Sequence, residues 1–238
     1  FALAQNIDAS TFTTTGLAAG SKYANLRALG NSSAAYAGTF TGLGHTVTGL
    51  TLSGSGNVGL FNSVSGTAQV RDVRLTNTSI TGTGNYTGAL VASAASGLTM
   101  TNVIMDGTSS VSNSASSYVG GLIGDAGSSN ITNAFATGAV TASASYQVGG
   151  LLGYHGGGSL TNVASSGGNI SGTSSVGGLV GWYGSGTITT ASTTGNVSGS
   201  TNVGGLVGYS NGTVNLTNAK ISDVSVTGAG NYVGGLTG

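Results

Sequence analysis

The chain has 238 residues, of which 4% are charged, and five basic residues balance five acidic ones. A neutral chain without basic clusters is not expected to bind nucleic acid or an anionic membrane, because both attract clustered Lys and Arg. The sequence has no Cys and no run of about 18 apolar residues, which excludes disulfides and thiolate metal sites and predicts no membrane-spanning helix.

Residues 1–57 are predicted to lead into a repeat. Residues 1–10 alternate apolar and polar side chains for part of their length and indicate a strand. Residues 13–35 are rich in Gly, Ala and Ser and indicate a loop or an irregular first coil, and residues 36–52 indicate two short strands around a Gly turn. The first five residues lack the basic start and long apolar core of a signal peptide. We therefore expect that the chain begins after processing or is a piece of something longer.

From Val58 onward a Val-Gly-Gly-Leu segment recurs, and its copies lie 27 to 32 residues apart. Seven copies with a period near 29 residues are typical of an array in which each unit stacks on its neighbours. The copies begin at Val58, Thr87, Val119, Val148, Val176, Val203 and Val233. We predict one continuous domain, with lead-in coils in residues 1–57 and a repeat solenoid in residues 58–238.

Each unit has three short apolar stations separated by Gly, Ser and Asn turns, and the Val-Gly-Gly-Leu segment is the first. The second station lies at Val70, Met100, Ile131, Leu160, Ile188 and Leu216. The third lies at Ile80, Val111, Val140, Ile170, Val197 and Val226. The absence of Pro and the abundance of β-branched residues favour strands at these stations. The pattern predicts an all-β fold, a three-sided parallel β-solenoid whose coils of about 29 residues lie about 4.7–4.9 Å apart. A meander of hairpins is the alternative, but the constant phase favours coiling.

The paired glycines of the first station allow two explanations. One is a bend that needs an unusual φ, and the other is a position too crowded for a side chain. The sequence leaves both open.

A polar residue, mostly Asn, recurs two residues after the second-station anchor. Its recurrence in one phase predicts a ladder of stacked side chains, as in cross-β arrays. A row of groups that contact a ligand is the functional alternative. The predicted ladder consists of Asp72, Asn102, Asn133, Asn162, Thr190 and Asn218.

Aromatic residues form the candidate ligand-binding surface. Tyr154, Trp182 and Tyr209 each fall six residues after the first anchor of their unit, and Tyr183 adjoins Trp182. On consecutive coils these rings would form a column with steps of about 5 Å, and such a column could stack sugar rings. The alternative is an aromatic ladder that covers a corner of the coil. Three other tyrosines are expected at the opposite corner: Tyr86, Tyr118 and Tyr232.

The two histidines give no sign of a metal site. His45 and His155 fall in different phases of the repeat, and the chain has no Glu to complete a His-Glu-x-x-His motif. We expect turn or surface histidines, with no metal and no cofactor.

One pair of carboxylates is a candidate catalytic site. Asp72 and Asp106 could meet on adjacent coils, and a glycosidase needs such a pair. Arg71 and Arg74 flank Asp72, however, and favour local ion pairs. Because ionisable groups for acid–base catalysis are so few, we predict no catalytic residue and no enzyme activity.

Thr is frequent, so an ice-binding face also has to be considered. Such a face would need a regular array of Thr in one phase of the repeat, and the Thr residues fall at different stations. This function is therefore not expected.

The Val-Gly-Gly-Leu-Val-Gly units, followed by Ile/Leu-Thr-Asn-Val/Ala, resemble GLUG-motif repeats. Residues 1–10, 40–47 and 58–61 resemble the segment that precedes such repeats in large bacterial surface proteins, and the likeness covers nearly all of the chain except residues 11–35. It implies a right-handed parallel β-helix of filamentous-haemagglutinin-like adhesins of two-partner secretion, or of related autotransporter passengers. GLUG repeats also occur in some surface proteases, whose catalytic part lies elsewhere. The amino-terminal secretion domain of the family is not recognisable in this sequence.

The repeat and the resemblance together predict a non-enzymatic, secreted or surface-bound β-solenoid, the shaft of a bacterial adhesin or fibre. Its expected partners are other copies of itself or adjoining parts of a longer chain, and host or matrix glycans. Two alternatives remain: a filament subunit that stacks end to end, and a β-helix that binds or cleaves polysaccharide.

Overall fold

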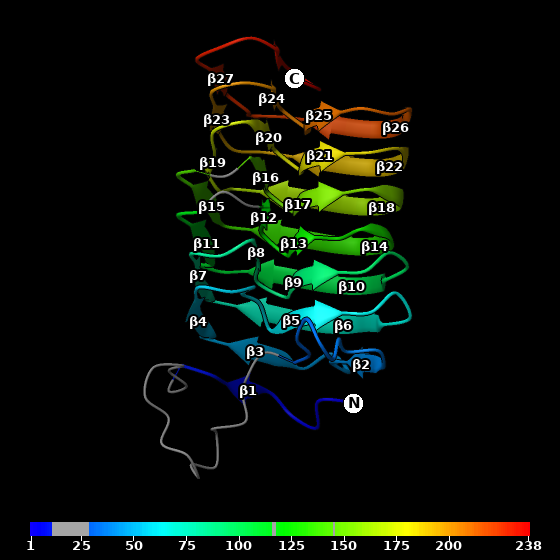
Figure 1. Ribbon diagram of the computed structural model, residues 1–238. Helices are drawn as coiled ribbons and strands as arrows, with labels where there is room; N and C mark the ends of the chain where they lie inside the picture. The colour runs from blue at the N-terminus through cyan, green and yellow to red at the C-terminus, as the bar shows by residue number, and fades with distance from the viewer. Residues whose placement is uncertain (11–28, 116–117, 145) are drawn as a thin grey trace.

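A computed structural model describes residues 1–10, 29–115, 118–144 and 146–238. Within these residues the chain forms strands and no helix. The strands stack in successive coils from the N-terminal to the C-terminal end (Figure 1), and every strand pair is parallel. The predicted parallel β-solenoid with coils of about 29 residues is confirmed. The predicted loop at 13–35 lies largely outside the described residues.

Each full coil contributes strands to four sheets, which we call sheets A to D. Sheet A contains β1 (Ile7–Asp8), β2 (Thr39–Thr41), β3 (Thr46–Thr48), β6 (Gln69–Thr76), β10 (Thr99–Asp106), β14 (Ser128–Thr137), β18 (Gly157–Ser166), β22 (Gly186–Thr193) and β26 (Val214–Ile221). Sheet B contains β5 (Phe61–Val64), β9 (Val91–Ala94), β13 (Ile123–Asp125), β17 (Leu152–His155), β21 (Val180–Tyr183) and β25 (Val207–Ser210).

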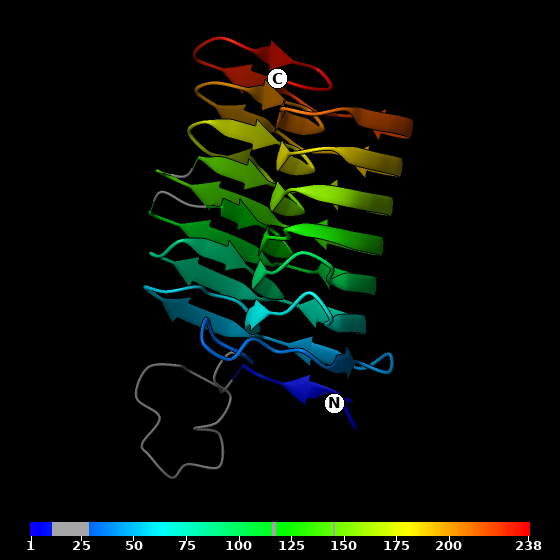
Figure 2. The same cartoon turned by 45° about the vertical axis from the view of Figure 1, so that its right-hand side comes forward.

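The other two sheets are built from shorter strands. Sheet C contains β4 (Thr51–Gly54), β7 (Ser79–Gly82), β11 (Ser110–Asn113), β15 (Ala139–Ala142), β19 (Ile170–Ser171), β23 (Val197–Gly199) and β27 (Val226–Gly228). Sheet D contains β8 (Tyr86–Gly88), β12 (Tyr118–Gly120), β16 (Gln147–Gly149), β20 (Ser175–Gly177), β24 (Val203–Gly204) and β28 (Val233–Gly234). Figure 2 shows the four sheets running side by side along the stack.

The first predicted station forms two strands instead of one. In the coil that begins at Tyr118, the strand β12 ends at Gly120 and β13 begins at Ile123, so Gly121 and Leu122 turn the chain from sheet D to sheet B. A coil therefore has one more strand than its three stations predict, because a change of direction within a continuous apolar segment leaves no mark on the hydrophobic pattern.

The predicted register is confirmed at the second and third stations. Met100 pairs with Val70 on one side and with Ile131 on the other, and the row continues through Leu160 and Ile188. In sheet C, Val111 pairs with Ile80 and with Val140 in the same way. Because side chains alternate across a strand, this register turns every anchor inward. The resulting core is continuous along the described coils.

The lead-in differs from the later coils in sheet A. Both β2 and β3 pair with β6, β2 along residues 69–71 and β3 along residues 74–76. Two short strands therefore take the place of one long strand, and residues 42–45 connect them at the level of Asp72. Leu43 and Gly44 of this connection line a hollow on the outer face of sheet A.

Candidate functional site

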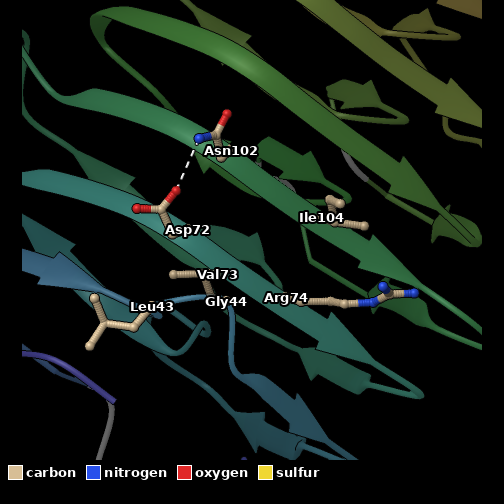
Figure 3. Close-up of a pocket in the computed structure, with 7 residues that line it drawn as sticks. All are labelled: Leu43, Gly44, Asp72, Val73, Arg74, Asn102 and Ile104. Carbon is tan, nitrogen blue, oxygen red and sulfur yellow. Dashed lines mark hydrogen bonds between the residues drawn. The ribbon is translucent and has the colours of Figure 1, made fainter. Parts of the chain in front are cut away.

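A hollow of about 450 Å³ opens on the outer face of sheet A, beside the connection between β2 and β3 (Figure 3). The close-up shows Leu43 and Gly44 on this connection and Arg74 and Ile104 on the neighbouring strands. The hollow is lined by Leu43, Gly44, Asp72, Val73, Arg74, Asn102 and Ile104. The hollow exists because four residues of the lead-in, 42–45, lie opposite only two residues of β6, Asp72 and Val73.

Charged side chains are concentrated around this hollow. Arg71 lies 3.6 Å from a carboxylate oxygen of Asp72, and Arg74 donates to Asp106 on the next coil. These four residues are nearly half of the ten charged residues of the chain. The predicted local ion pair of Asp72 is confirmed with Arg71, whereas Arg74 pairs with Asp106 across coils. Asp106 lies opposite Thr76, so the two aspartates, which the sequence suggested could meet, do not lie opposite each other.

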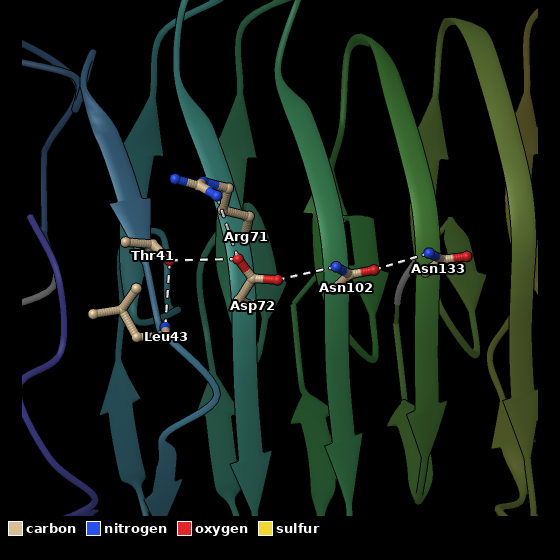
Figure 4. A network of polar contacts seen from close by, with 6 residues as sticks. All are labelled: Thr41, Leu43, Arg71, Asp72, Asn102 and Asn133. Atoms are coloured by element: carbon tan, nitrogen blue, oxygen red, sulfur yellow. Dashed lines mark hydrogen bonds and ion pairs between the residues drawn. The ribbon is translucent and has the colours of Figure 1, made fainter.

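The predicted ladder begins at the same place (Figure 4). Asn102 donates to Asp72 at 3.0 Å, Asn133 donates to Asn102 at 2.8 Å, and Asn162 donates to Asn133 at 2.8 Å. At its N-terminal end, the hydroxyl of Thr41 lies 3.5 Å from the second oxygen of Asp72. The amide side chains thus link successive coils on the outer surface, beside the backbone pairing.

The six ladder positions share a left-handed backbone conformation, with φ between 51° and 56°. Asn and Asp adopt this conformation more readily than other residues with side chains. It bends each long strand of sheet A: in β10, Met100 and Val103 both point inward although they are three positions apart, where strict alternation would turn them to opposite faces. The recurring Asn therefore serves the bend as well as the ladder. Thr190 is the exception, since a β-branched side chain is strained there.

Replacing Thr190 with Asn is expected to raise the free energy of unfolding by about 1–2 kcal/mol. The gain comes from relief of the β-branched residue at φ 56° and from amide hydrogen bonds to the neighbouring coils. Urea unfolding followed by circular dichroism measures it. The matched control is Thr189→Asn, one position earlier and outside the left-handed region. An equal change in both variants would contradict this account.

Five aromatic side chains form one column along the corner between sheets D and B. The ring centroids of Tyr118 and Tyr154 lie 5.0 Å apart with 14° between planes, and those of Tyr154 and Trp182 lie 4.5 Å apart with 7°. Tilted contacts extend the column to Tyr86 at 5.4 Å and to Tyr209 at 6.4 Å. The expectation that Tyr86 and Tyr118 cap an opposite corner is wrong, because the turn at Gly121 brings sheets D and B together.

This stacking limits what the column can bind. A sugar ring packs against an aromatic face, but the faces of Tyr154 and Trp182 are turned toward each other. Ring edges and the two ends of the column remain for a ligand. Asp125 lies beside these rings, and burial raises the pKa of its carboxyl group although the amide of Gly127 donates to it at 2.9 Å. The geometry therefore favours an aromatic ladder that stiffens a corner.

Tyr183 and His155 lie inside the solenoid, which corrects two expectations. Tyr183 is fully buried, so it offers no surface to a sugar, and His155 is neither a turn nor a surface histidine. Their rings stack 4.9 Å apart in adjacent coils. The reason is strand alternation: Tyr154 and Trp182 face outward, so the residue after each faces inward.

Backbone carbonyls satisfy most of the polar atoms of this buried pair. The hydroxyl of Tyr183 lies 3.1 Å from the carbonyl oxygen of Gly158, and burial raises its pKa to about 12. Nε2 of His155 lies 3.1 Å from the carbonyl oxygen of Ser129, whereas Nδ1 has no partner among the described residues. Burial lowers the pKa of His155 to about 4. The pair is a polar element of the core and lies away from the outer-face hollow.

The Thr residues are more regular than the sequence indicates. Pairing in sheet A places five of them in one outward row, in the order Thr101, Thr132, Thr161, Thr189 and Thr217. The statement that Thr is scattered among stations is therefore wrong for this row. Each of these residues directly precedes a ladder residue, so the row accompanies the bend. The parallel row two residues earlier mixes Thr, Asn and Ser, so it does not complete a flat Thr array.

No cluster of three or more His, Cys, Asp or Glu side chains that could hold a metal ion occurs in the described part of the chain. His45 is near the N-terminal end, where its Nδ1 lies 3.3 Å from the side-chain oxygen of Asn6. Over the same residues, no helix of the length and apolarity that a bilayer crossing requires is found.

Comparisons with known proteins agree with this architecture. The family model of the GLUG motif matches residues 115–141 and 144–171, in the middle of the repeat array. A solved structure, a "putative immunoglobulin A1 protease" from Bacteroides ovatus, is similar over 99% of this chain and 77% of that chain, with a TM-score of 0.68 and 16% identity. At this identity the likeness shows the fold alone. No curated protein matches the chain. The chain is thus a parallel β-solenoid that carries GLUG motifs.

Proposed function

We propose that the chain is a non-enzymatic, extracellular segment of a bacterial surface protein, where it forms the rigid and adhesive shaft of an adhesin or fibre. The observation that carries the proposal is unbroken pairing between coils. Sheet A runs from β1 to β26 without a missing partner, and a continuous apolar core follows it. Such a rod holds its two ends at a fixed distance, since each coil adds about 4.7–4.9 Å.

The chemistry of the surface supports a role without catalysis. A general acid or base has to be poised beside a substrate. Asp72 and Asp106 are each held in an ion pair with an arginine, and the strand register pairs Asp106 with Thr76, four residues along β6 from Asp72. The GLUG motifs support an extracellular location, since they typically belong to extracellular β-helix proteins. The protease name of the Bacteroides ovatus structure belongs to that protein, and the shared fold supports only the scaffold here.

The test is a comparison of adhesion with turnover. Beads coated with the purified chain are expected to attach saturably to immobilised host or matrix polysaccharides, and soluble chain should compete. Incubation of the chain with immunoglobulin A1 or with acidic polysaccharides is expected to leave both intact. Cleavage of either substrate, lost on heat denaturation of the chain, would overturn the non-enzymatic assignment. Failure of the beads to attach to any surface would overturn the adhesive one.

A further inference from the structure

We propose that the hollow beside the Leu43–Gly44 turn binds an acidic saccharide, with its carboxylate on Arg74 and a ring face against Leu43 and Ile104. This inference names a ligand class for the adhesive function and rests on that function. It follows from three features of the hollow: its backbone, its charges and the pairing of the strands around it.

The backbone at Leu43 is strained without any compensation from packing. Leu43 has φ 50° and is 60% exposed, so a left-handed conformation is imposed on a large side chain that points into water. Most other non-Gly residues with positive φ in the described ranges are Asn or Asp, for which this conformation is less costly. Strained residues of this kind cluster at ligand-binding and active sites, where the surrounding structure holds them in place. A saccharide ring packed over Leu43 would cover its exposed apolar side chain.

The turn also leaves room for a ligand. Gly42 lies so close to β6 that an added Cβ would sit 2.0 Å from the carbonyl oxygen of Asp72. Two residues later, a Cβ on Gly44 would meet nothing within 4 Å. The chain therefore leaves the sheet sharply between these glycines, and the open side of the turn faces the hollow (Figure 3).

Hydrogen-bonding capacity in the hollow favours an acceptor-rich ligand. Both oxygens of Asp72 are engaged, one by Asn102 and the other by Thr41 and Arg71. Arg74 is half exposed, and it forms an ion pair with Asp106 on the next coil. A guanidinium has five N–H donors, so several remain for a ligand. A carboxylate matches them because it accepts two parallel hydrogen bonds from one guanidinium.

Apolar side chains lie beside the Arg74 guanidinium at the hollow. Ile104 pairs with Arg74 in register, and Phe135 follows in the same outward row. With Leu43 they place apolar surface next to the guanidinium, and a saccharide offers the matching combination of CH face and carboxylate. A volume of about 450 Å³ lies within the usual range for small-molecule sites.

Strand pairing argues against a peptide as the occupant. Extended peptides bind by adding a strand to a free sheet edge. The strand β6 is paired with β2 and β3 on one side and with β10 on the other, so its backbone offers no edge beside the hollow. A ligand there has to be held by side chains, as a saccharide is.

The experiment titrates the purified chain with digalacturonate and, separately, with its dimethyl ester, by isothermal calorimetry. The acid is expected to bind at least about tenfold more tightly than the ester, a difference of about 1.4 kcal/mol. Arg74→Gln should weaken binding of the acid about tenfold and leave the ester unaffected. Lys220→Gln is the matched control, because Lys220 occupies the same outward row in β26, far from the hollow. It should bind like the unmodified chain.

Leu43→Gly separates binding from folding. Glycine accepts the left-handed backbone, so this variant should unfold at a higher temperature than the unmodified chain and yet bind both ligands several-fold more weakly. Equal affinity for acid and ester, or unchanged binding by Leu43→Gly, would overturn the inference.

The bead assay distinguishes the inference from the broader proposal. If the unmodified chain does not bind digalacturonate and Arg74→Gln beads still attach, the saccharide site in the hollow is overturned and the adhesive function is retained. If the unmodified chain binds digalacturonate but coated beads attach to no surface, the adhesive function is overturned and the saccharide site in the hollow is retained.

Discussion

Replacing Gly149 with Ala is expected to lower the free energy of unfolding by at least about 4 kcal/mol. A Cβ on Gly149 would lie 2.0 Å from the carbonyl oxygen of Leu152 and 2.7 Å from the amide nitrogen of Gly181 in the next coil. Both atoms belong to the backbone, so relief requires two coils to shift. The backbone of Gly149 is not in the positive-φ region. Crowding therefore explains this glycine, and of the two explanations left open by the sequence, the bend does not apply here.

The matched control is Gly56→Ala, because a Cβ on Gly56 meets nothing within 4 Å and its φ is not positive. Thermal and urea unfolding, followed by the strand signal in circular dichroism, measure both variants. Gly56→Ala should stay close to the unmodified chain. Similar losses in the two variants would mean that contact between coils is not the cause. The crowded position is Gly in all seven copies: Gly59, Gly88, Gly120, Gly149, Gly177, Gly204 and Gly234.

Acid is expected to destabilise the solenoid through His155. Burial lowers the pKa of His155 from 6.5 to about 4 in the folded chain. Above pH 6.5 the ring is neutral in both states, and its contribution to stability is complete. Between pH 6.5 and pH 4 the unfolded chain binds a proton that the folded chain does not, so the free energy of unfolding falls as the pH falls, by about 3 kcal/mol over this window.

The variant His155→Phe isolates this contribution. Phenylalanine keeps an aromatic ring against Tyr183 and cannot take up a proton, so its free energy of unfolding should fall less between pH 7 and pH 4. Urea unfolding at several pH values gives both curves, and the carboxyl groups common to the two proteins cancel in their difference. Parallel curves would show that another group is responsible for the acid sensitivity.

The positions of the strands were predictable because they depend on local spacing. Val70, Met100 and Ile131 each begin an alternating apolar segment, and the alternation by itself decides which side chains face inward. The same rule, applied one residue beyond Tyr154, would have placed His155 in the core. That signal was present in the sequence, but the Gly-rich surroundings of His155 favoured a turn.

The candidate site was less predictable, since it depends on what neighbouring coils bring together. Leu43 carries no motif, and its strain and exposure follow from β2 and β3 pairing with a single strand, β6. The contact between Tyr118 and Tyr154 joins residues of different repeat phases, because sheets D and B meet at a corner. Repeat alignment compares residues of one phase and does not reveal such contacts.

The sequence by itself determined the repeat length, the inward-facing anchors and the polar ladder positions, because each follows from a period along one chain. Only the tertiary structure decided the four sheets, the crowding at Gly149, the contact between Tyr118 and Tyr154 and the hollow at Leu43. These features arise where backbones of adjacent coils approach within contact distance. Their geometry depends on how the chain turns between strands, and a hydrophobic pattern holds no information about the direction of that turn.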